Sequence, residues 1–251
     1  MSSLWLHRVT KWFDNVSAVN SVTIEFRAGE IAALIGPNGA GKTTVFNLIG
    51  GHLSPTEGHI FYDDVEISSK SPWRIAKFGI GRMFQEVRTF QRMSVRNNVM
   101  VAFPGQTGEN AVWSVIARST VQKQEKKLEQ ETDELLETVG LLSYASREAR
   151  ELSYGQQKLL AIARLLAARP NVLLLDEPTA GVTRSIAEKI LRILRGIADE
   201  GKTVVLIEHD MNVVNNWVDE LHFMDRGRLW VSGDPDRVLG RSHVQRAYLG
   251  V

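Results

Sequence analysis

Apolar and polar side chains alternate through the first thirty residues of the chain. The apolar positions include Val9, Val16, Val19, Val22, Ile24 and Phe26. A period of two places such residues on one face of an extended chain. The segment is therefore predicted to form antiparallel strands separated by turns.

Later segments contain unbroken apolar runs. These are Ile31–Ile35 and Val172–Leu175, and Thr203–Ile207 is a further predicted buried strand. Residues 43–49 and 186–199 have helical composition, and the first of these helices ends at Gly50 and Gly51. Buried strands that alternate with helices predict a parallel sheet covered on both faces. Residues 221–224 and 228–231 predict a terminal hairpin.

The region from about residue 72 to residue 140 has a different pattern. Residues 122–139 are rich in Lys, Glu and Gln, with Leu128, Leu135, Leu136 and Val139 at helical spacing. This predicts an amphipathic helix that ends at Gly140; its charged face either binds a partner or is simply solvated. Another helix runs from Ser153 to about Ala168. We expect one folding unit with two lobes: a core of residues 1–85 and 170–251, and a helical lobe of about 86–169.

Composition narrows the function. The chain has 251 residues, a net charge of +1 and no cysteine. The charge balance argues against nucleic acid as a partner, and the lack of cysteine excludes disulfides and thiolate metal sites. No apolar run is long enough to cross a bilayer, and we expect no secretory signal at the amino end. Any connection to a membrane is therefore expected to run through a partner.

Residues 36–43 read Gly-Pro-Asn-Gly-Ala-Gly-Lys-Thr and match the P-loop pattern. Gly39 and Gly41 let the backbone wrap with its N–H groups toward a polyphosphate, and the following helix adds its positive end. Lys42 would reach the β- and γ-phosphates, and the Thr43 hydroxyl would ligate Mg²⁺. The expected nucleotide-binding residues are Gly36, Pro37, Asn38, Gly39, Ala40, Gly41, Lys42, Thr43 and Thr44.

Charged residues follow two of the predicted strands. Asp176 ends the run that starts at Val172, which is where a Mg²⁺-associated carboxylate of a P-loop enzyme belongs. Glu177 could orient and deprotonate an attacking water, or be an ordinary exposed acid. His209 follows the next strand and could contact a γ-phosphate, or be a structural histidine.

A second candidate anion site is Leu152-Ser-Tyr-Gly-Gln156, just before a helix. The Ser153 hydroxyl, the Gly155 N–H and a helix N-terminus suit a phosphate, although a serine N-cap is the alternative. The segment resembles the signature sequence of ABC ATPases, usually written L-S-G-G-Q. In that family it contacts the γ-phosphate of ATP held by the opposite subunit.

The resemblance covers essentially the whole chain and implies further roles. Phe13 resembles the aromatic residue that stacks on adenine, with Ala18 and Val19 beside it. Gln85 looks like the glutamine that touches Mg²⁺ and water, and His209 like the switch histidine. Ser153, Gly155 and Gln156 would bind the second nucleotide. The implied fold is an α/β P-loop NTPase with a RecA-like core of mostly parallel sheet, an N-terminal antiparallel β subdomain and an inserted α-helical lobe.

Two positions depart from the family pattern. Tyr154 stands where glycine is usual in the signature. Thr183 stands where the family usually carries Asp or Asn, a residue that normally crosses to the other P-loop. The replacement at Thr183 puts in doubt how tightly two ATP sites are coupled, and it leaves open a subunit that binds ATP without turning it over.

Several phrases resemble the ATPase subunits of branched-chain amino-acid importers, a group that also serves urea and short amides. They are residues 44–47, 84–90, 207–211 and 247–250, together with the tyrosine-bearing signature. This implies an ATPase that uses ATP and Mg²⁺ at the cytoplasmic face of the inner membrane. Its expected partners are a second ATPase subunit, identical or not, permease subunits that dock near residues 87–99, and indirectly a solute-binding protein. Lipopolysaccharide-export ATPases and soluble ABC ATPases are the alternatives, and the residues do not specify the cargo or the direction of transport.

Overall fold

The computed structural model describes residues 3–106 and 118–249, and these fall into two compact units. The first unit comprises residues 1–85, 170–180 and 194–251, and the second comprises residues 86–169 and 181–193. The sequence had placed residues 181–193 in the core, whereas here they group with the helical residues. Gly250, from the carboxyl-terminal importer phrase, lies outside the described residues.

The first unit contains a four-stranded sheet of order β2-β1-β4-β5. Its strands are β1 (Ser3–Phe13), β2 (Val16–Arg27), β4 (Glu57–Tyr62) and β5 (Val65–Glu66). Strands β1 and β2 pair antiparallel, as predicted, with Leu4 opposite Phe26 and Leu6 opposite Ile24. These four side chains are buried, so most of the alternation seen in the sequence marks the inward face; Val16, at the start of β2, is exposed instead.

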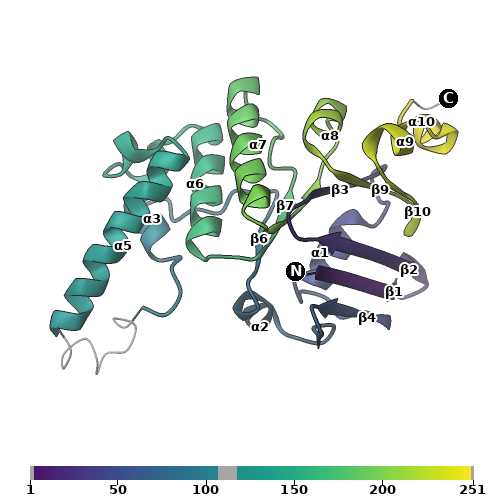
Figure 1. Ribbon diagram of the computed structural model, residues 1–251, viewed down its shortest axis with the longest axis horizontal. Coiled ribbons are helices and arrows are strands. Elements are labelled where there is room, and N and C mark those ends of the chain that lie inside the picture. The colour runs from purple at the N-terminus through teal and green to yellow at the C-terminus, as the bar shows by residue number, and fades with distance from the viewer. Residues whose placement is uncertain (1–2, 107–117, 250–251) are drawn as a thin grey trace. The chain divides into compact units, whose positions relative to one another are not determined.

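A six-stranded sheet of order β10-β9-β3-β8-β7-β6 forms the rest of its framework. The strands are β3 (Ile31–Ile35), β6 (Ile80–Met83), β7 (Val172–Asp176), β8 (Thr203–Ile207), β9 (Glu220–Asp225) and β10 (Arg228–Gly233). Strands β3, β8, β7 and β6 run parallel. All residues of β3, β7 and β8 are buried, which confirms the prediction of a covered parallel sheet (Figure 1).

Helix α1 (Lys42–Ile49) packs between the two sheets. Its apolar residues Val45, Phe46, Leu48 and Ile49 belong to one buried cluster with residues of β1, β2, β3, β7 and β8. The short helices α2 (Pro72–Lys77), α8 (Met211–Trp217), α9 (Pro235–Leu239) and α10 (Ser242–Leu249) complete the unit. None of these four was predicted: segments of five to eight residues give too few turns for a periodic signal, and unlike α1 none of them follows a P-loop pattern.

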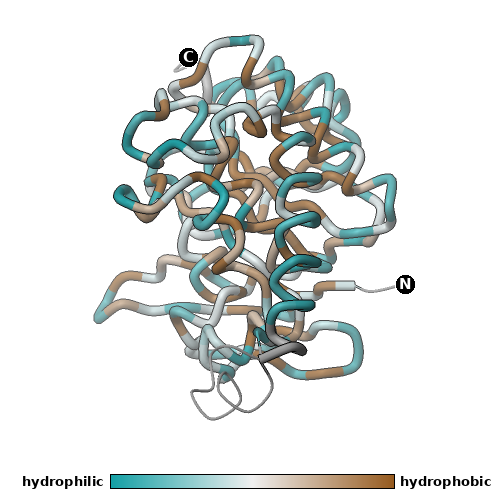
Figure 2. Tube along the Cα trace, turned by 90° about the vertical axis from the view of Figure 1, so that its left-hand side faces the viewer, coloured by the Kyte–Doolittle hydropathy of each residue, from teal (hydrophilic) through white to brown (hydrophobic). Residues whose placement is uncertain are grey.

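The second unit is helical, as expected. It contains α3 (Val95–Met100), α5 (Arg118–Thr138), the 3₁₀ turns η2 (Leu142–Tyr144) and η3 (Ala149–Glu151), and α6 (Tyr154–Ala167). Helix α7 (Arg184–Asp199) begins in this unit. The trace of α5 is mostly hydrophilic in Figure 2. Leu128 and Leu136 form the buried stripe of α5.

Parallel strands end at the same edge of a sheet, and that edge carries the candidate chemistry. Strand β3 leads into Gly36, β6 leads into Phe84 and Gln85, and β7 ends in Asp176 and leads into Glu177. Strand β8 leads into Glu208 and His209. Among the described residues, no helix is both long and apolar enough to span a membrane.

Candidate functional site

The loop from Gly36 to Gly41 connects β3 to α1, and close backbone contacts require glycine at positions 36 and 41. A Cβ atom on Gly36 would lie 2.0 Å from the carbonyl oxygen of Met224 in β9. A Cβ atom on Gly41 would lie 2.4 Å from the carbonyl oxygen of Ala18. Both glycines have positive φ angles, 147° and 101°, and Gly39 has a φ of 79°. The loop conformation is therefore set both by its own dihedrals and by strands on either side.

Helix α1 offers its N-terminus to a ligand. Its N-cap residue Gly41 has no side chain that could accept from the first-turn N–H groups, and no acidic residue stands in that turn. These N–H groups have no intrahelical acceptor, so the helix start suits an anion. The Thr43 side chain is exposed there.

Lys42 is the cation of this loop. Its side chain is largely buried, and its Nζ donates to the carbonyl oxygens of Gly36 at 2.7 Å and Pro37 at 3.0 Å. Burial lowers the pKa of Lys42, and the charges of Glu177 and Asp176 partly oppose that effect. The ammonium group thus lies in the field of both carboxylates, at the place where a phosphate would add further negative charge.

The three residues expected beside adenine differ in how much of each is exposed. Phe13 ends β1 and is 44% exposed, with Lys11 Nζ 5.5 Å from its ring centroid. The carbonyl of Ala18 lies against the P-loop glycine Gly41. Val19, by contrast, has a fully buried side chain in the hydrophobic core, so only its backbone is left to contact a nucleotide.

Asp176 is a buried carboxylate at the end of β7. Burial raises its pKa, while the nearby Arg82 acts in the opposite direction. Arg82 Nη2 lies 3.8 Å from Asp176 Oδ2. The sequence analysis did not identify Arg82, because Gly81 and Arg82 interrupt the apolar pattern of β6 and hide the strand. Its only local signal is a basic residue three positions before Gln85.

Glu177 brings together the three residues predicted to act in catalysis. Its Oε2 accepts a hydrogen bond from Gln85 Nε2 at 3.0 Å, and its Oε1 lies 3.1 Å from His209 Nε2. Glu177 itself has a φ of 49°, a conformation that is unusual for a residue other than glycine. Its N–H donates to the carbonyl of Ile207 at 3.0 Å. The loops after β6, β7 and β8 therefore meet at one carboxylate.

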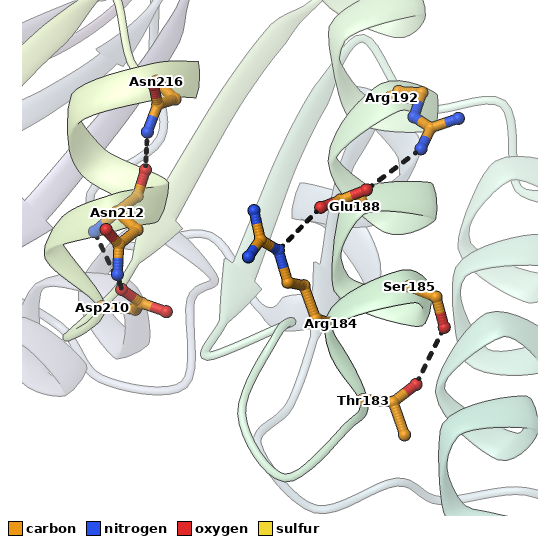
Figure 3. Close-up of polar contacts among 8 residues, drawn as sticks. All are labelled: Thr183, Arg184, Ser185, Glu188, Arg192, Asp210, Asn212 and Asn216. Atoms are coloured by element: carbon orange, nitrogen blue, oxygen red, sulfur yellow. Dashed lines mark hydrogen bonds and ion pairs between the residues drawn. The ribbon is translucent and has the colours of Figure 1, made fainter.

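The loop after β8, which contains His209, is held by polar contacts of the residues on both sides of His209. Glu208 is buried and accepts a hydrogen bond from Thr179 Oγ1 at 2.8 Å. Asp210 caps α8 by accepting from Asn212 N at 2.8 Å, as Figure 3 shows. The sequence analysis missed Thr179 and Glu208, because neither residue belongs to a local pattern that indicates a contact between two loops.

The candidate magnesium ligands are oxygen donors, which is the chemistry that Mg²⁺ prefers. They are the Thr43 hydroxyl, the Asp176 carboxylate and the Gln85 side-chain amide. Among the described residues no group of three or more His, Cys, Asp or Glu side chains could hold a metal. One carboxylate with neutral oxygens fits an ion that completes its coordination with phosphate oxygens and water rather than an all-protein site.

The signature segment lies in the second unit and starts helix α6. Ser153 is its N-cap: Ser153 Oγ accepts from Gln156 N at 3.4 Å, and Gln156 Oε1 accepts from Ser153 N at 2.9 Å. The serine N-cap considered from the sequence is therefore present. It uses the Ser153 oxygen as an acceptor and leaves the hydroxyl proton available for a ligand oxygen.

Residues around α7 pack against this segment. A Cβ atom on Gly155 would lie 2.5 Å from Ile186 Cδ1, so a larger residue there would have to displace the end of the Ile186 side chain. The unusual Tyr154 lies next to Gly181, where an added Cβ would be 3.2 Å from Tyr154 Cε1. Tyr154 thus occupies space beside the loop that leads to Thr183.

Thr183 makes a local contact at the start of α7. Its Oγ1 lies 3.2 Å from Ser185 Oγ, and Figure 3 shows both side chains on this turn. Farther along the helix, Glu188 pairs with Arg184 and Arg192 at 3.0 and 3.3 Å. These exposed ion pairs contribute little to stability.

The segment expected to meet a permease, residues 87–99, includes the start of α3. Asn98 is completely buried and shapes the preceding loop. Its Nδ2 donates to the carbonyls of Phe90, Met93 and Ser94, and its Oδ1 accepts from Phe90 N. The ring of Phe90 remains 50% exposed.

The whole chain was compared with protein families, with curated proteins and with solved structures. The family described as ABC transporter matches residues 19–180. The high-affinity branched-chain amino acid transport ATP-binding protein LivG of Escherichia coli (strain K12) is 36% identical over 239 residues, which is 95% of this chain and 94% of the relative.

Solved structures of ATP-binding cassettes are similar to this chain over nearly its whole length. The ADP conformation of an ATP-binding cassette of an ABC transporter has a TM-score of 0.84 and 31% identity, and covers 100% of both chains. A dimeric structure of a post-hydrolysis state of an ATP-binding cassette, bound to ADP and Pi, has a TM-score of 0.76 and 26% identity, over 92% of this chain and 98% of the other.

Proposed function

The chain belongs to the ABC transporter family as an ATP-binding and ATP-hydrolysing subunit, and we propose that it powers the import of branched-chain or related amino acids. Urea and short amides belong to the same proposed cargo class. The support for the cargo is the likeness to LivG, which extends over 95% of this chain.

We propose that ATP binds along the loop from Gly36 to Thr44. The uncapped start of α1 and the buried Lys42 are suited to the phosphates, and the exposed ring of Phe13 offers a face for adenine. Bound Mg²⁺ would neutralise phosphate charge in this site. The Thr43 hydroxyl, the Gln85 amide and the Asp176 carboxylate would hold it.

Glu177 is the proposed general base, and its surroundings are the observation that carries this role. Both carboxylate oxygens have partners in the structure, Gln85 on one side and His209 on the other. An attacking water would replace one of these partners and donate its proton to the carboxylate as its oxygen attacks the γ-phosphorus; the bond from that phosphorus to the β–γ bridging oxygen would break, and ADP would leave. His209 would keep the other oxygen in place and contact the γ-phosphate.

We propose that two cassettes enclose two ATP molecules, each between a P-loop and the signature segment of the opposite subunit. The Ser153 hydroxyl proton and the N–H groups at the start of α6 are the groups that would meet the γ-phosphate. ATP would therefore favour the closed dimer, and loss of the γ-phosphate would favour opening. A permease docked near residues 87–99 would use this cycle at the cytoplasmic face of a membrane.

ATP turnover of Glu177→Gln tests the catalytic role. Glutamine keeps the size of the side chain and can still bond Gln85 and His209, but it cannot accept the proton. We expect ATP binding to persist and the turnover rate to fall by about 10²–10⁴-fold. Equal turnover in the two proteins would refute the assignment of Glu177.

The same variant tests the dimer. With saturating MgATP, Glu177→Gln should shift from monomer to dimer in sedimentation velocity, and Ser153→Ala in that background should stay monomeric. A Glu177→Gln protein that remains monomeric with MgATP, even with its permease supplied, would contradict the proposal that two subunits enclose two ATP molecules.

Cargo requires the complete transporter. The chain should co-purify with the permease subunits encoded beside it, and vesicles containing the complex should take up leucine in an ATP-dependent manner. Uptake of urea or an amide without leucine would correct the cargo, and export of a lipid-linked sugar would replace the import proposal.

A further inference from the structure

Arg82 is a buried arginine beside the proposed magnesium carboxylate. Its side chain is 8% exposed, and that of Asp176 is 6% exposed. Arg82 Nη2 lies 3.8 Å from Asp176 Oδ2, and Arg82 Nη1 donates to Asn47 Oδ1 at 2.7 Å. The guanidinium group therefore lies between a side chain of helix α1 and the end of strand β7.

Two aromatic rings restrict the guanidinium group further. Its central carbon is 4.6 Å from the ring centroid of Phe84 and 5.7 Å from that of Phe46. Phe84 is only two residues away on the chain, and Phe46 belongs to α1. A planar group with an aromatic ring centroid 4.6 Å away and a hydrogen bond at one end has little freedom to rotate. The orientation of the positively charged guanidinium group relative to Asp176 is therefore fixed.

The contact with Asn47 ties two parts of the proposed metal site together. Asn47 lies four residues after Thr43 on the same helix, so both residues move with α1. Asp176 belongs to β7, in another part of the chain. Arg82 bridges the helix that carries the Thr43 hydroxyl and the strand that carries the Asp176 carboxylate.

We propose that Arg82 is a positioning residue for Mg²⁺–nucleotide binding, and that it acts by holding the Asp176 carboxylate in a fixed orientation relative to helix α1. The inference rests on the proposed role of Asp176 at Mg²⁺. Mg²⁺ tolerates little departure from octahedral geometry, so the orientation of a carboxylate ligand matters to its binding. Mutation of a residue that contacts a metal ligand, without itself contacting the metal, typically lowers metal affinity by 10- to 100-fold.

Two other roles give different results on mutation. A purely structural Arg82 would support the whole nucleotide site, and its loss would weaken nucleotide binding with and without metal to the same extent. An Arg82 that only competes with the metal for Asp176 would, when removed, make metal binding tighter. The measurement must therefore separate metal affinity from nucleotide affinity.

Mn²⁺ is a suitable probe because its free aqueous ion gives an electron paramagnetic resonance signal. We would titrate Mn²⁺ into the full-length protein saturated with ADP, and measure ADP affinity separately by calorimetry in EDTA. Arg82→Gln and Arg82→Lys should each weaken Mn²⁺ binding by about 10-fold or more. ADP affinity in EDTA should stay within about twofold. Lysine keeps the charge but cannot form the two-ended contact, so it separates orientation from charge.

Asn47→Ala provides a second route to the same result if the Arg82 variants fold poorly. This change leaves the charge of Arg82 in place but removes its hydrogen bond to α1, and it should also weaken Mn²⁺ binding. Arg74→Gln is the matched control, because Arg74 is an exposed arginine on α2 in the same unit. It should leave Mn²⁺ affinity unchanged.

Asp176→Asn separates failure of this inference from failure of the proposed site. If Asp176→Asn weakens Mn²⁺ binding and the Arg82 and Asn47 variants do not, Arg82 has no positioning role. Tighter Mn²⁺ binding in Arg82→Gln, or equal losses of Mn²⁺ and metal-free ADP affinity, would also overturn the inference. If Asp176→Asn itself binds Mn²⁺ normally, the proposed metal site is wrong.

Discussion

Acid should destabilise the core sheet through His222, a histidine in β9 that is 2% exposed. Its Nδ1 lies 2.8 Å from Ser232 Oγ, and its ring meets the Phe26 ring edge-on at 5.3 Å. Burial, with a smaller effect of the Arg27 charge, lowers the pKa of His222 from 6.5 to about 4. The folded protein thus keeps this ring neutral at pH values where an unfolded chain would protonate it.

The magnitude follows from the difference between the two pKa values. Because the folded-state pKa is the lower one, the unfolded chain binds the extra proton between pH 6.5 and about 4. The contribution of His222 to stability is complete above pH 6.5 and is lost as the pH falls through this window. The loss amounts to about 2 kcal/mol at pH 5 and to roughly 3 kcal/mol once the pH is below the folded-state pKa.

Urea unfolding of His222→Asn and of the unmutated chain, at pH 7.5 and pH 5.0, measures this contribution. Asparagine has no proton to gain in this range. Between pH 7.5 and pH 5.0, the unmutated chain should therefore lose about 2 kcal/mol of unfolding free energy relative to His222→Asn. Circular dichroism is a sufficient probe.

Val205→Ala is the control, because it removes buried apolar volume from β8 without removing an ionisable group. Its cost should be the same at both pH values. If the difference between His222→Asn and the unmutated chain is also unchanged with pH, the reasoning from burial to pKa to stability is wrong for this residue.

Three further substitutions test local geometry. Gly36→Ala should lower the affinity for a fluorescent ATP analogue by at least about 100-fold, because its Cβ would lie 2.0 Å from the Met224 carbonyl oxygen; binding within threefold of the unmutated chain would contradict this. Asn98→Ala should cost about 2–3 kcal/mol in urea unfolding, because the carbonyls around Phe90 lose a buried donor, and a cost under about 0.5 kcal/mol would argue against it. Ser153→Gly should cost only a few tenths of a kcal/mol of stability, since glycine is tolerated at an N-cap, yet reduce ATP turnover sharply; normal turnover would show that the hydroxyl is not needed.

Much of the fold could be read from the sequence, because its signals are local. The run Ile31–Ile35 and the P-loop after it contain their own strand, turn and helix start within a few residues. The antiparallel strands and the helical unit follow from apolar periodicity, and the parallel sheet follows from unbroken apolar runs that alternate with helices. Strand β6 was missed, since Gly81 and Arg82 give it no such period. It is a strand because it pairs with β7, with Ile80 opposite Val172 and Met83 opposite Leu175.

The sequence by itself determined the P-loop pattern and the positions of the candidate residues after β7 and β8, because helix starts and strand ends are encoded by neighbouring residues, whereas the candidates Phe13 and Gln85 were predicted from the family resemblance. Only the tertiary structure decided how they are held. Gln85 reaches Glu177 across 92 positions of sequence, Arg82 reaches Asn47 across 35, and Gly36 needs to be glycine because Met224 approaches it from another strand. Such contacts depend on the order of strands in a sheet, and no local pattern of residues specifies that order.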